Sequence, residues 1–566
     1  MSIPSATRLP NTSSVNIEAY IAALEKGSHL LARMSISQRK RLLHACIKGV
    51  GEQSEKWIEA SWEAKHIPTD SGARAEDIMT GPMPTLRYLH LLYCSLCDIE
   101  QLGKPQLPGI PYQVNGQWRV PVFPTSQLYD ALLFGPMKAE TWLQTGADEE
   151  NLFGNHIELV SGKGNLAPQI AVVLGAGNVS SIPITDALSK LFQDGHAVLL
   201  KMNPVNEYLG PIFEDAFASL IDVDLLRIVY GGGEIGSQLV HHEAVDEIHI
   251  TGSDKTHDTI VWGQNSEERQ RLQSRNAPLL SKRITSELGN VSPWIIVPGE
   301  YSKRQLYFQA ENIVSSITHN ASFNCIATKM LVTWRQWPER EMFLNKIDSI
   351  LSEIEPRYPY YPGATERFER FTGQAVKDNR SQFLPWTLLR DVDPEIQPHL
   401  FQEESFVCVC AETVINADTE DEFLSRATEL VNDQMWGTLS AAITVPSEFH
   451  NRRAECLFQL LEELHYGVIG VNQWPGVAFA LMSPPWGGFP GTTLQNVQSG
   501  IGFVHNTYLL DQVEKTVLSS PLTFWPKPMW FSTHRCPEEV AWKLLKLYKK
   551  PSLRRLPPVL LNALRG

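Results

Sequence analysis

The chain has 566 residues, enough for two or three domains with large apolar cores. Its 43% hydrophobic and 20% charged residues are typical of a globular protein and exclude a disordered or fibrous one. The formal net charge of −14 disfavours nucleic-acid binding as the main task, because contacts to phosphates need a basic surface. The sequence contains no run of about 18 apolar residues and no apolar segment at its start, so we expect a cytoplasmic protein without a membrane span.

The cysteine pattern predicts reduced thiols. Eight cysteines are too sparse for a disulfide scaffold in a chain of this length. Cys94 and Cys97 form a C-x-x-C pair inside an apolar helical segment, and no second pair follows at zinc spacing. Cys408 and Cys410 alternate along a predicted strand. We favour buried packing over redox or metal chemistry for all four, and we predict no metal site.

The first third of the chain changes character near residue 100. Residues 16–100 are predicted to be mostly helical, because Ile17–Leu24 and Arg39–Ile47 place apolar residues at helical spacing. Residues 104–135 are rich in proline and glycine and include the β-prone segment Gln117–Phe123. We expect loops and extended strands there.

From about residue 167 apolar strands alternate with helices. Strands are predicted at 169–174, 197–200, 226–230 and 247–250, and helices at 184–192, 208–220 and 235–241. Such alternation indicates a parallel sheet covered on both faces, which binds nucleotides at the carboxyl ends of its strands. A second α/β stretch is predicted from about Pro293 to Val471.

Five short motifs fall at successive strand ends and in one following loop, and their order is more informative than any one of them. They are Gly175–Val179, Lys201–Pro204, the glycine-rich Gly231–Gly236 with Thr251–Ser253, Ser286–Pro293, and Asn320–Cys325. With them, the sequence resembles the aldehyde dehydrogenase superfamily over roughly residues 165–505. The resemblance implies an α/β fold with a Rossmann-type nucleotide-binding domain, an α/β catalytic domain and a β oligomerisation arm.

The resemblance assigns three catalytic residues. Cys325 is the expected nucleophile, Glu287 the base that activates water, and Asn178 a donor to the oxyanion, as this chemistry requires. The family usually has Pro-Trp before this asparagine and Gly and Gln at the positions of Ser322 and Phe323. Taken alone, each catalytic candidate has a simpler interpretation: a buried structural cysteine, a solvated strand-end carboxylate and a turn asparagine.

The resemblance also implies NAD or NADP as cofactor. Its expected ligands are Lys201, Gly233, Gly236, Thr251, Gly252, Ser253 and, for the nicotinamide ribose, Glu404. Glycines let the backbone approach a phosphate closely, and a helix N-terminus can hold a pyrophosphate oxygen. Many NAD-dependent members have a glutamate where this chain has Pro204, so the choice between NAD and NADP stays open. Extra residues relative to the family are expected between Gly263 and Asn276.

The expected activity is oxidation of an apolar aldehyde to a carboxylic acid through a cysteine thiohemiacetal and thioester. Trp474 and Phe479 are candidates to line the substrate tunnel, with packing as the alternative. A second interpretation is an acyl-thioester reductase or CoA-acylating dehydrogenase, which Pro204 favours and Glu287 disfavours. A third is a relative that has lost catalysis, against which the complete set of site residues argues.

The resemblance further suggests a domain organisation. We expect a nucleotide-binding domain with N-terminal helices over 1–286, a catalytic domain over 287–490, and a return to the cofactor domain over 491–535. We place the arm at about 114–150, with strand candidates at Trp118–Leu133 and Gly502–Leu510 that extend a neighbour's sheet in a homodimer or tetramer.

The segment 536–566 is predicted to be a basic amphipathic tail. It has seven Lys and Arg residues and no acidic residue from Val540 onward. A helix is expected up to Lys550, after which Pro551, Pro557 and Pro558 should break it. The tail either packs on the acidic body or contacts an anionic membrane.

Overall fold

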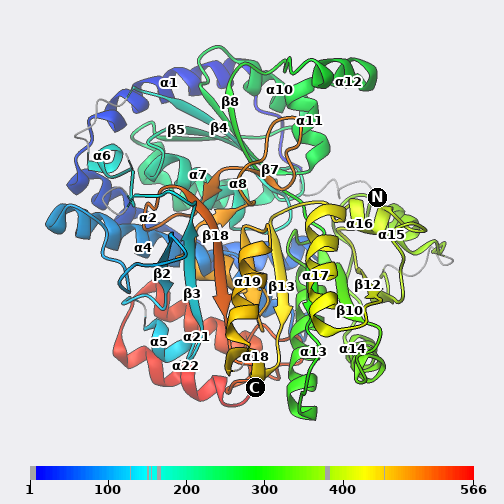
Figure 1. Ribbon diagram of the computed structural model, residues 1–566. Coiled ribbons are helices and arrows are strands. Elements are labelled where there is room, and N and C mark those ends of the chain that lie inside the picture. Colours follow the sequence, from blue (N-terminus) through cyan, green and yellow to red (C-terminus); the bar gives the residue numbers. More distant parts are fainter. Residues whose placement is uncertain are drawn as a thin grey trace.

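The computed structural model describes residues 8–127, 129–148, 152–154, 156–161, 167–376, 383–451 and 453–566. It contains a six-stranded sheet, a ten-stranded sheet and helices that cover both (Figure 1). None of the helices among these residues is long and apolar enough to cross a membrane.

The six-stranded sheet confirms the predicted parallel arrangement. Its order is β16-β8-β7-β4-β5-β6, and only the short edge strand β16 is antiparallel. The strands are β4 (Ile170–Leu174), β5 (Ala197–Lys201), β6 (Leu226–Val229), β7 (Glu247–Gly252), β8 (Arg283–Leu288) and β16 (Gly500–Ile501). Their side chains are buried on both faces, which explains the continuous apolar runs in the sequence.

Helices cover the two faces of this sheet. The apolar residues of α1 (Ser14–Ala32) pack with Val172 and Leu199, whereas those of α7 (Ile182–Phe192) pack with the alternate positions Val173 and Leu200. The predicted helix at 208–220 is interrupted into η3 (Glu207–Leu209), α8 (Gly210–Ala216) and α9 (Ala218–Ile221). The remaining helices here are α10 (Gly233–His241), α11 (Asp254–Trp262) and α12 (Ser266–Ser274), and α12 lies within the extra residues expected after Gly263.

The ten-stranded sheet has the order β1-β2-β3-β18-β14-β13-β9-β10-β12-β11. Its central strands are β9 (Pro293–Ile296), β10 (Met330–Trp334), β12 (Val409–Ile415), β13 (Ser440–Thr444) and β14 (Val468–Val471), with β11 (Thr387–Leu389) at one edge. The helices of this region are α13 (Lys303–Thr318), α14 (Arg340–Glu353), α15 (Ala364–Thr372), α16 (His399–Gln402), α17 (Glu420–Glu429), η5 (Leu430–Gln434), α18 (Ser447–Asn451), α19 (Ala454–Glu463) and α20 (Gly476–Leu481).

The strands of the predicted arm pair within the chain. Strands β1 (Tyr112–Val114), β2 (Gln117–Phe123) and β3 (Lys138–Leu143) join β18 (Val513–Ser519), which pairs in parallel with β14 of the same chain. Within the chain, the arm therefore continues the catalytic sheet, and β1 forms its outer edge. The segment Gly502–Leu510 contributes only β17 (Phe503–Val504), which pairs with β15 (Trp486–Gly487), because the long β-prone run begins at Val513.

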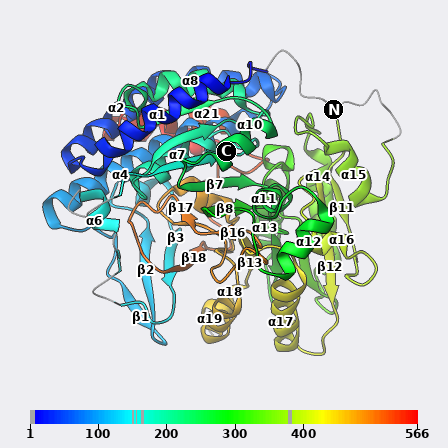
Figure 2. The same ribbon diagram turned by 90° about the horizontal axis from the view of Figure 1, so that it is seen from above.

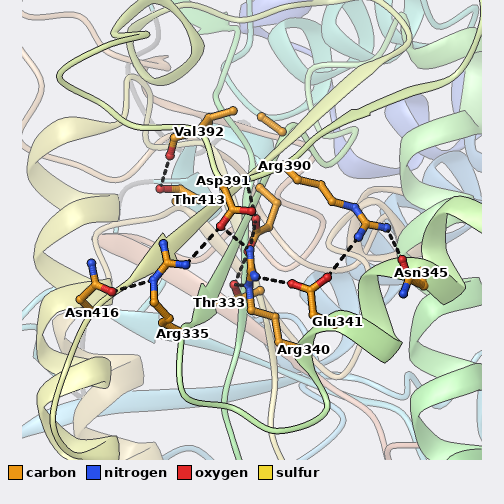
Figure 3. Close-up of polar contacts among 12 residues, drawn as sticks. Thr333, Arg335, Arg340, Glu341, Asn345, Arg390, Asp391, Val392, Thr413 and Asn416 are labelled. Atoms are coloured by element: carbon orange, nitrogen blue, oxygen red, sulfur yellow. Dashed lines mark hydrogen bonds and ion pairs between the residues drawn. The ribbon is translucent and has the colours of Figure 1, made fainter.

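A buried ion-pair cluster fastens α14 to strands β10 and β12 (Figure 3). The Arg340 guanidinium donates to the two carboxylate oxygens of Glu412 at 2.9 and 2.8 Å, and to Asp391 at 2.9 Å. The Thr333 hydroxyl also donates to Glu412, whose side chain is fully buried. Because the hydrogen bonds offset the desolvation of both charges, we assign this cluster a structural role.

The N-terminal helices stack along one flank of the molecule (Figure 2). They are α1, α2 (Ile36–Ala64), the short α3 (Arg74–Met79) and α4 (Pro82–Leu102), as the helical spacing predicted. Ser35 and Gln38 form a capping box at the start of α2, and such caps satisfy free N–H groups. Cys94 and Cys97 lie on α4, and Cys408 and Cys410 are buried at the start of β12.

The C-terminal segment packs on the body. Helix α21 (Pro537–Lys549) buries Leu544, Leu545 and Tyr548 against α3 and α4. The prediction that prolines end helical structure after Lys550 was wrong in part, because Pro557 and Pro558 begin a further helix, α22 (Leu556–Ala563). Proline is compatible with the first turn of a helix, where no intrahelical N–H bond is lost. Short elements complete the list: α5 (Asp130–Leu133), α6 (His156–Ser161) and η6 (Leu553–Arg555).

Candidate active site

Cys325 lies in a loop between α13 and β10. The chain reaches it through η4 (His319–Ser322), in which Asn320, Ala321 and Ser322 have φ values of 53°, 55° and 66°. Three consecutive left-handed residues other than glycine are costly, and a family glycine would relieve the strain at Ser322. The turn is held from both sides, since the Asn320 N–H donates to Glu76 at 2.9 Å and its side-chain amide donates to Asn178 O at 3.0 Å.

Glu287 is the nearest acid to the Cys325 thiol. Its Oε1 lies 3.7 Å from Cys325 Sγ, and the residue sits at the carboxyl end of β8 with 3% of its surface exposed. Burial raises the pKa of Glu287 to about 8, and the negative charge of Asp186 adds to the shift. A carboxyl group with this pKa can exchange protons near neutral pH, as a general base must. The two residues that the Ser286–Pro293 and Asn320–Cys325 motifs single out are therefore adjacent.

The thiol is strongly biased to its protonated form. Burial raises the pKa of Cys325 well above its ordinary value, and the charges of Glu287 and Glu404 raise it further. The ammonium of Lys329 acts in the opposite direction. Because the thiolate is the nucleophilic species, the balance of these three charges governs the reactivity of the site.

Asn178 borders the same loop. Its side-chain Nδ2 donates to Phe323 O at 3.1 Å, and its backbone carbonyl accepts from Tyr360 Oη at 3.0 Å. The Lys65 ammonium reaches Asn320 Oδ1 at 3.0 Å and is paired with Asp77, so a buried charge pair supports the arrangement. One N–H of the Asn178 amide thus fixes the loop before Cys325, and its second N–H makes no hydrogen bond among the described residues.

A cavity of about 920 Å³ opens at the carboxyl ends of the six-stranded sheet. Its lining includes all ten residues singled out by the sequence: Asn178, Lys201, Gly233, Gly236, Thr251, Gly252, Ser253, Glu287, Cys325 and Glu404. A side chain added at Gly233 or Gly236 would meet no atom within 4 Å, so these glycines face open space. Burial lowers the pKa of Lys201 to about 8. The cavity has the size of a nucleotide site, and polar and charged side chains are among the residues that line it.

Thr251 and Ser253, which are expected cofactor ligands, already make hydrogen bonds within the chain. The Thr251 hydroxyl donates to Asp186 Oδ2 at 2.7 Å. The Ser253 side chain caps α11 by accepting from Thr256 N at 3.2 Å. The Ser253 hydroxyl also lies 3.0 Å from the Thr256 hydroxyl, and either of the two can donate. Ser253 stands at a helix N-terminus, where an anion can bind, whereas Thr251 is better placed to shape the strand end.

A second, smaller cavity of about 60 Å³ also borders Cys325. It is lined mainly by apolar side chains: Met79, Met83, Phe134, Val179, Trp474, Val477, Phe479, Ala480, Leu481, Trp486, Met529 and Trp530, with Tyr548 from α21. Trp474 and Phe479 are both in this wall. The two cavities share Ile182, Glu287 and Cys325, so the thiol stands where they meet.

Sequence reasoning missed several parts of the site. Lys329 bridges the Cys325 loop and Glu404, with 3.3 Å between its Nζ and Glu404 Oε1. Tyr548 reaches the apolar cavity from the tail and accepts a 3.2 Å hydrogen bond from Arg87, which is paired with Asp130. Lys329 could have been considered from its position four residues after Cys325. No feature of the sequence indicated that the C-terminal segment carries Tyr548 to this cavity.

Comparisons with known proteins find relatives of one kind. A sequence model described as the aldehyde dehydrogenase family matches residues 184–355. The FUS7 protein of Gibberella moniliformis, named an aldehyde dehydrogenase, is 25% identical over 154 residues, which are 27% of this chain and 30% of that protein. The chain thus matches less than a third of the length of that relative.

Solved structures extend the likeness to the whole fold. Aldehyde dehydrogenase 21 from Physcomitrella patens, crystallised with succinate, has a TM-score of 0.60 and 15% identity, covering 90% of this chain and 91% of that one. A glyceraldehyde-3-phosphate dehydrogenase from Methanocaldococcus jannaschii, complexed with NADP, has a TM-score of 0.58 and 16% identity, covering 91% and 96%. Aldehyde dehydrogenase C from Pseudomonas syringae, complexed with NAD⁺ and octanal, has a TM-score of 0.59 and 14% identity, covering 90% and 89%.

Proposed function

We propose that this chain is a member of the aldehyde dehydrogenase family, whose model matches residues 184–355, and that it oxidises an apolar aldehyde to a carboxylic acid with NAD or NADP. The observation that carries the proposal is the position of Cys325. Its thiol stands where a nucleotide-sized cavity meets a smaller, apolar one, with Glu287 at 3.7 Å. A cofactor in the larger cavity and an apolar substrate in the smaller one would meet at this atom.

The residues support a two-stage reaction. Cys325 attacks the aldehyde carbon, and the free N–H of Asn178 together with the Cys325 backbone N–H stabilises the oxyanion of the thiohemiacetal. A nicotinamide held in the larger cavity would supply the hydride acceptor, and Cys325 would then carry the acyl group as a thioester. Glu287 then takes a proton from water, whose oxygen attacks the thioester and releases the carboxylic acid and the thiol.

The larger cavity fits a dinucleotide. Gly233 and Gly236 leave room for a phosphate beside the N-terminus of α10, and Ser253 offers a second helix N-terminus. The Lys201 side chain places a positive charge in the cavity wall. Pro204 stands where many NAD-dependent members have a glutamate, so that position has no carboxylate to repel a 2′-phosphate. We therefore expect NADP to be accepted at least as readily as NAD.

The substrate is proposed to be a linear, apolar aldehyde. The smaller cavity has a nearly continuous apolar wall, and Thr80, His319, Asn324 and Tyr548 are its few polar members besides Glu287. Burial of each methylene group in such a wall contributes about 0.8 kcal/mol, so longer chains should bind more tightly until the cavity is filled. The small volume favours an unbranched chain.

A second candidate is a CoA-acylating dehydrogenase, in which a thiol and not water resolves the thioester. Pro204 favours it, because a proline at this position resembles the acylating branch. Glu287 favours the hydrolytic reaction, because a base with a pKa near 8 lies beside the thiol. The hydrolytic reaction is our first choice.

The two candidates separate in one experiment. Purified protein is incubated with a series of linear and aromatic aldehydes and either NAD⁺ or NADP⁺, with and without CoA. We expect cofactor reduction without CoA and a free acid as product. Reduction that requires CoA would establish the acylating reaction instead, and a protein that binds cofactor but reduces none would support the third interpretation, a relative without catalysis.

Assembly and membrane contact also stay proposals. We propose a homodimer or tetramer, with the exposed edge strand β1 available for pairing. The tail leaves Leu553, Leu561 and Leu564 exposed beside Arg554, which suits a peripheral contact with an anionic membrane. We propose a cytoplasmic protein that contacts the membrane surface, where an apolar aldehyde dissolved in the lipid would be close to the enzyme.

A further inference from the structure

Lys329 is a buried cation placed directly behind the nucleophile. Its side chain is 4% exposed, and its Nζ donates to three carbonyl oxygens of the Cys325 loop: Asn324 O at 2.9 Å, Ala327 O at 3.0 Å and Cys325 O at 3.4 Å. An ammonium has three N–H donors, so these carbonyls can satisfy it completely.

These contacts also set the direction of the loop's N–H groups. A peptide unit is planar and trans, so its N–H points away from its carbonyl. Because Asn324 O is turned toward Lys329, the Cys325 N–H points away from Lys329. The Ser292 hydroxyl holds the Cys325 carbonyl from another side at 2.9 Å. Lys329 therefore helps to orient the backbone donor proposed for the oxyanion.

Glu404 makes a fourth contact with the same ammonium, at 3.3 Å from its Oε1. Its carboxylate lines the nucleotide cavity and rests on the backbone at Gly289, where an added Cβ would lie 2.1 Å from Oε2. Burial raises the pKa of Glu404, with Lys329 acting against this. Three carbonyl oxygens already accept hydrogen bonds from the Lys329 ammonium. Glu404 can therefore turn toward a ligand without leaving the buried cation unpartnered.

We propose that Lys329 is a positioning residue that stabilises the Cys325 thiolate, and that its ion pair with Glu404 restrains this effect until a ligand in the nucleotide cavity engages the Glu404 carboxylate. The inference rests on the proposed function for the identity of that ligand. A nucleotide ribose offers two vicinal hydroxyl donors, which is the chemistry that a carboxylate on the cavity wall accepts.

The charges around the thiol explain why a ligand bound to Glu404 should favour the Cys325 thiolate. Glu287 and Glu404 oppose ionisation of Cys325, and Lys329 favours it. When ribose hydroxyls hold the Glu404 carboxylate, its charge is shared with them, and the charge of Lys329 acts on the thiol with less compensation. The site thus becomes reactive when the cofactor is bound, which protects the thiol from reacting without a hydride acceptor.

The test measures how fast iodoacetamide alkylates Cys325 at neutral pH, by mass spectrometry of the peptide that carries it. The rate follows the thiolate fraction, and the seven other cysteines serve as internal references. Wild-type protein is measured without cofactor and with saturating NAD⁺ or NADP⁺. We expect the cofactor to accelerate alkylation of Cys325 about tenfold, which corresponds to about one pKa unit.

Two substitutions examine the ion pair from each side. Glu404→Gln should accelerate alkylation about tenfold without any cofactor, because the restraint is gone. Lys329→Gln, which keeps N–H donors but loses the charge, should be slow and should respond little to cofactor, whereas Lys329→Arg should keep most of the response. Thermal unfolding of each variant confirms that the chain is folded.

A double variant completes the cycle. If Glu404 acts through Lys329, Glu404→Gln should accelerate alkylation much less in the Lys329→Gln background than in wild type. Full acceleration by cofactor in Lys329→Gln, or a Glu404→Gln protein as slow as wild type, would overturn the proposal. Quenching of tryptophan fluorescence reports cofactor binding separately. If nothing binds, the proposed function fails, yet the variants compared without cofactor still test the role of Lys329.

Discussion

Replacement of Glu287 by glutamine separates the two stages of the proposed reaction. Glutamine keeps the size of the side chain but cannot accept the proton of the attacking water. Cys325 can still form the thioester, so we expect one turnover of reduced cofactor per active site, followed by steady-state turnover at least about 100-fold slower than wild type, within the usual range for general-base catalysis.

The pH dependence follows from the raised pKa of Glu287, which is about 8. Only about a tenth of the carboxyl groups are ionised at pH 7 and about nine tenths at pH 9, so deacylation in wild type should rise about tenfold over this range. The Glu287→Gln variant should lose this rise. Stability changes in the opposite direction. Because the folded pKa lies above the unfolded value of 4.5, neutral Glu287 stabilises the fold at low pH, and this stability is lost as the pH rises toward 8.

The size of that stability effect is also fixed by the pKa. A pKa shift from 4.5 to about 8 should lower the free energy of unfolding of wild type by about 4–5 kcal/mol between pH 4 and pH 9. The Glu287→Gln variant, which has no carboxyl group at this position, should not show this decrease. Rapid-mixing absorbance measurements of reduced cofactor and urea unfolding at several pH values check both parts. Unchanged steady-state turnover in Glu287→Gln, or the same pH dependence of unfolding in both proteins, would refute the reasoning.

Four further predictions follow from the site and the surface. Cys325→Ser should abolish dehydrogenase activity with unchanged thermal unfolding; more than a few per cent of residual activity would remove Cys325 as the nucleophile. Ala480→Phe fills the apolar cavity and should raise KM for long aldehydes at least about tenfold while sparing short ones; an equal effect on all chain lengths would place the substrate elsewhere. Light scattering should show a dimer or tetramer, and a monomer at micromolar concentration would contradict it. Leu561→Asp should reduce co-sedimentation with anionic but not neutral vesicles, and equal binding by both proteins would exclude the tail as the contact.

The parts of the fold that local patterns determine were predictable. The strands β4, β5, β6 and β7 are continuous apolar runs, and only a parallel sheet buried on both faces accommodates such runs. The positions of Glu287 and Cys325 followed from motif order, and their separation of 3.7 Å agrees with the joint role assigned to them. These features depend on short stretches of sequence and on family resemblance.

Features that depend on distant contacts were not predictable. Nothing near Val513 shows that β18 pairs with β14 of the same chain, because a β-prone edge strand carries no mark of its partner. The contact between Lys329 and Glu404 joins residues 75 positions apart through the fold. Tyr548 likewise reaches the apolar cavity only because α21 packs on α3 and α4.

The most direct test of the central claim is a covalent one. Glu287→Gln protein is incubated with a linear aldehyde and oxidised cofactor, digested at acidic pH and analysed by mass spectrometry. We predict an acyl group bound as a thioester to the peptide containing Cys325, released by hydroxylamine, and absent when cofactor is omitted. Reduced cofactor formed without an adduct on Cys325, or an acyl group on another residue, would contradict the account.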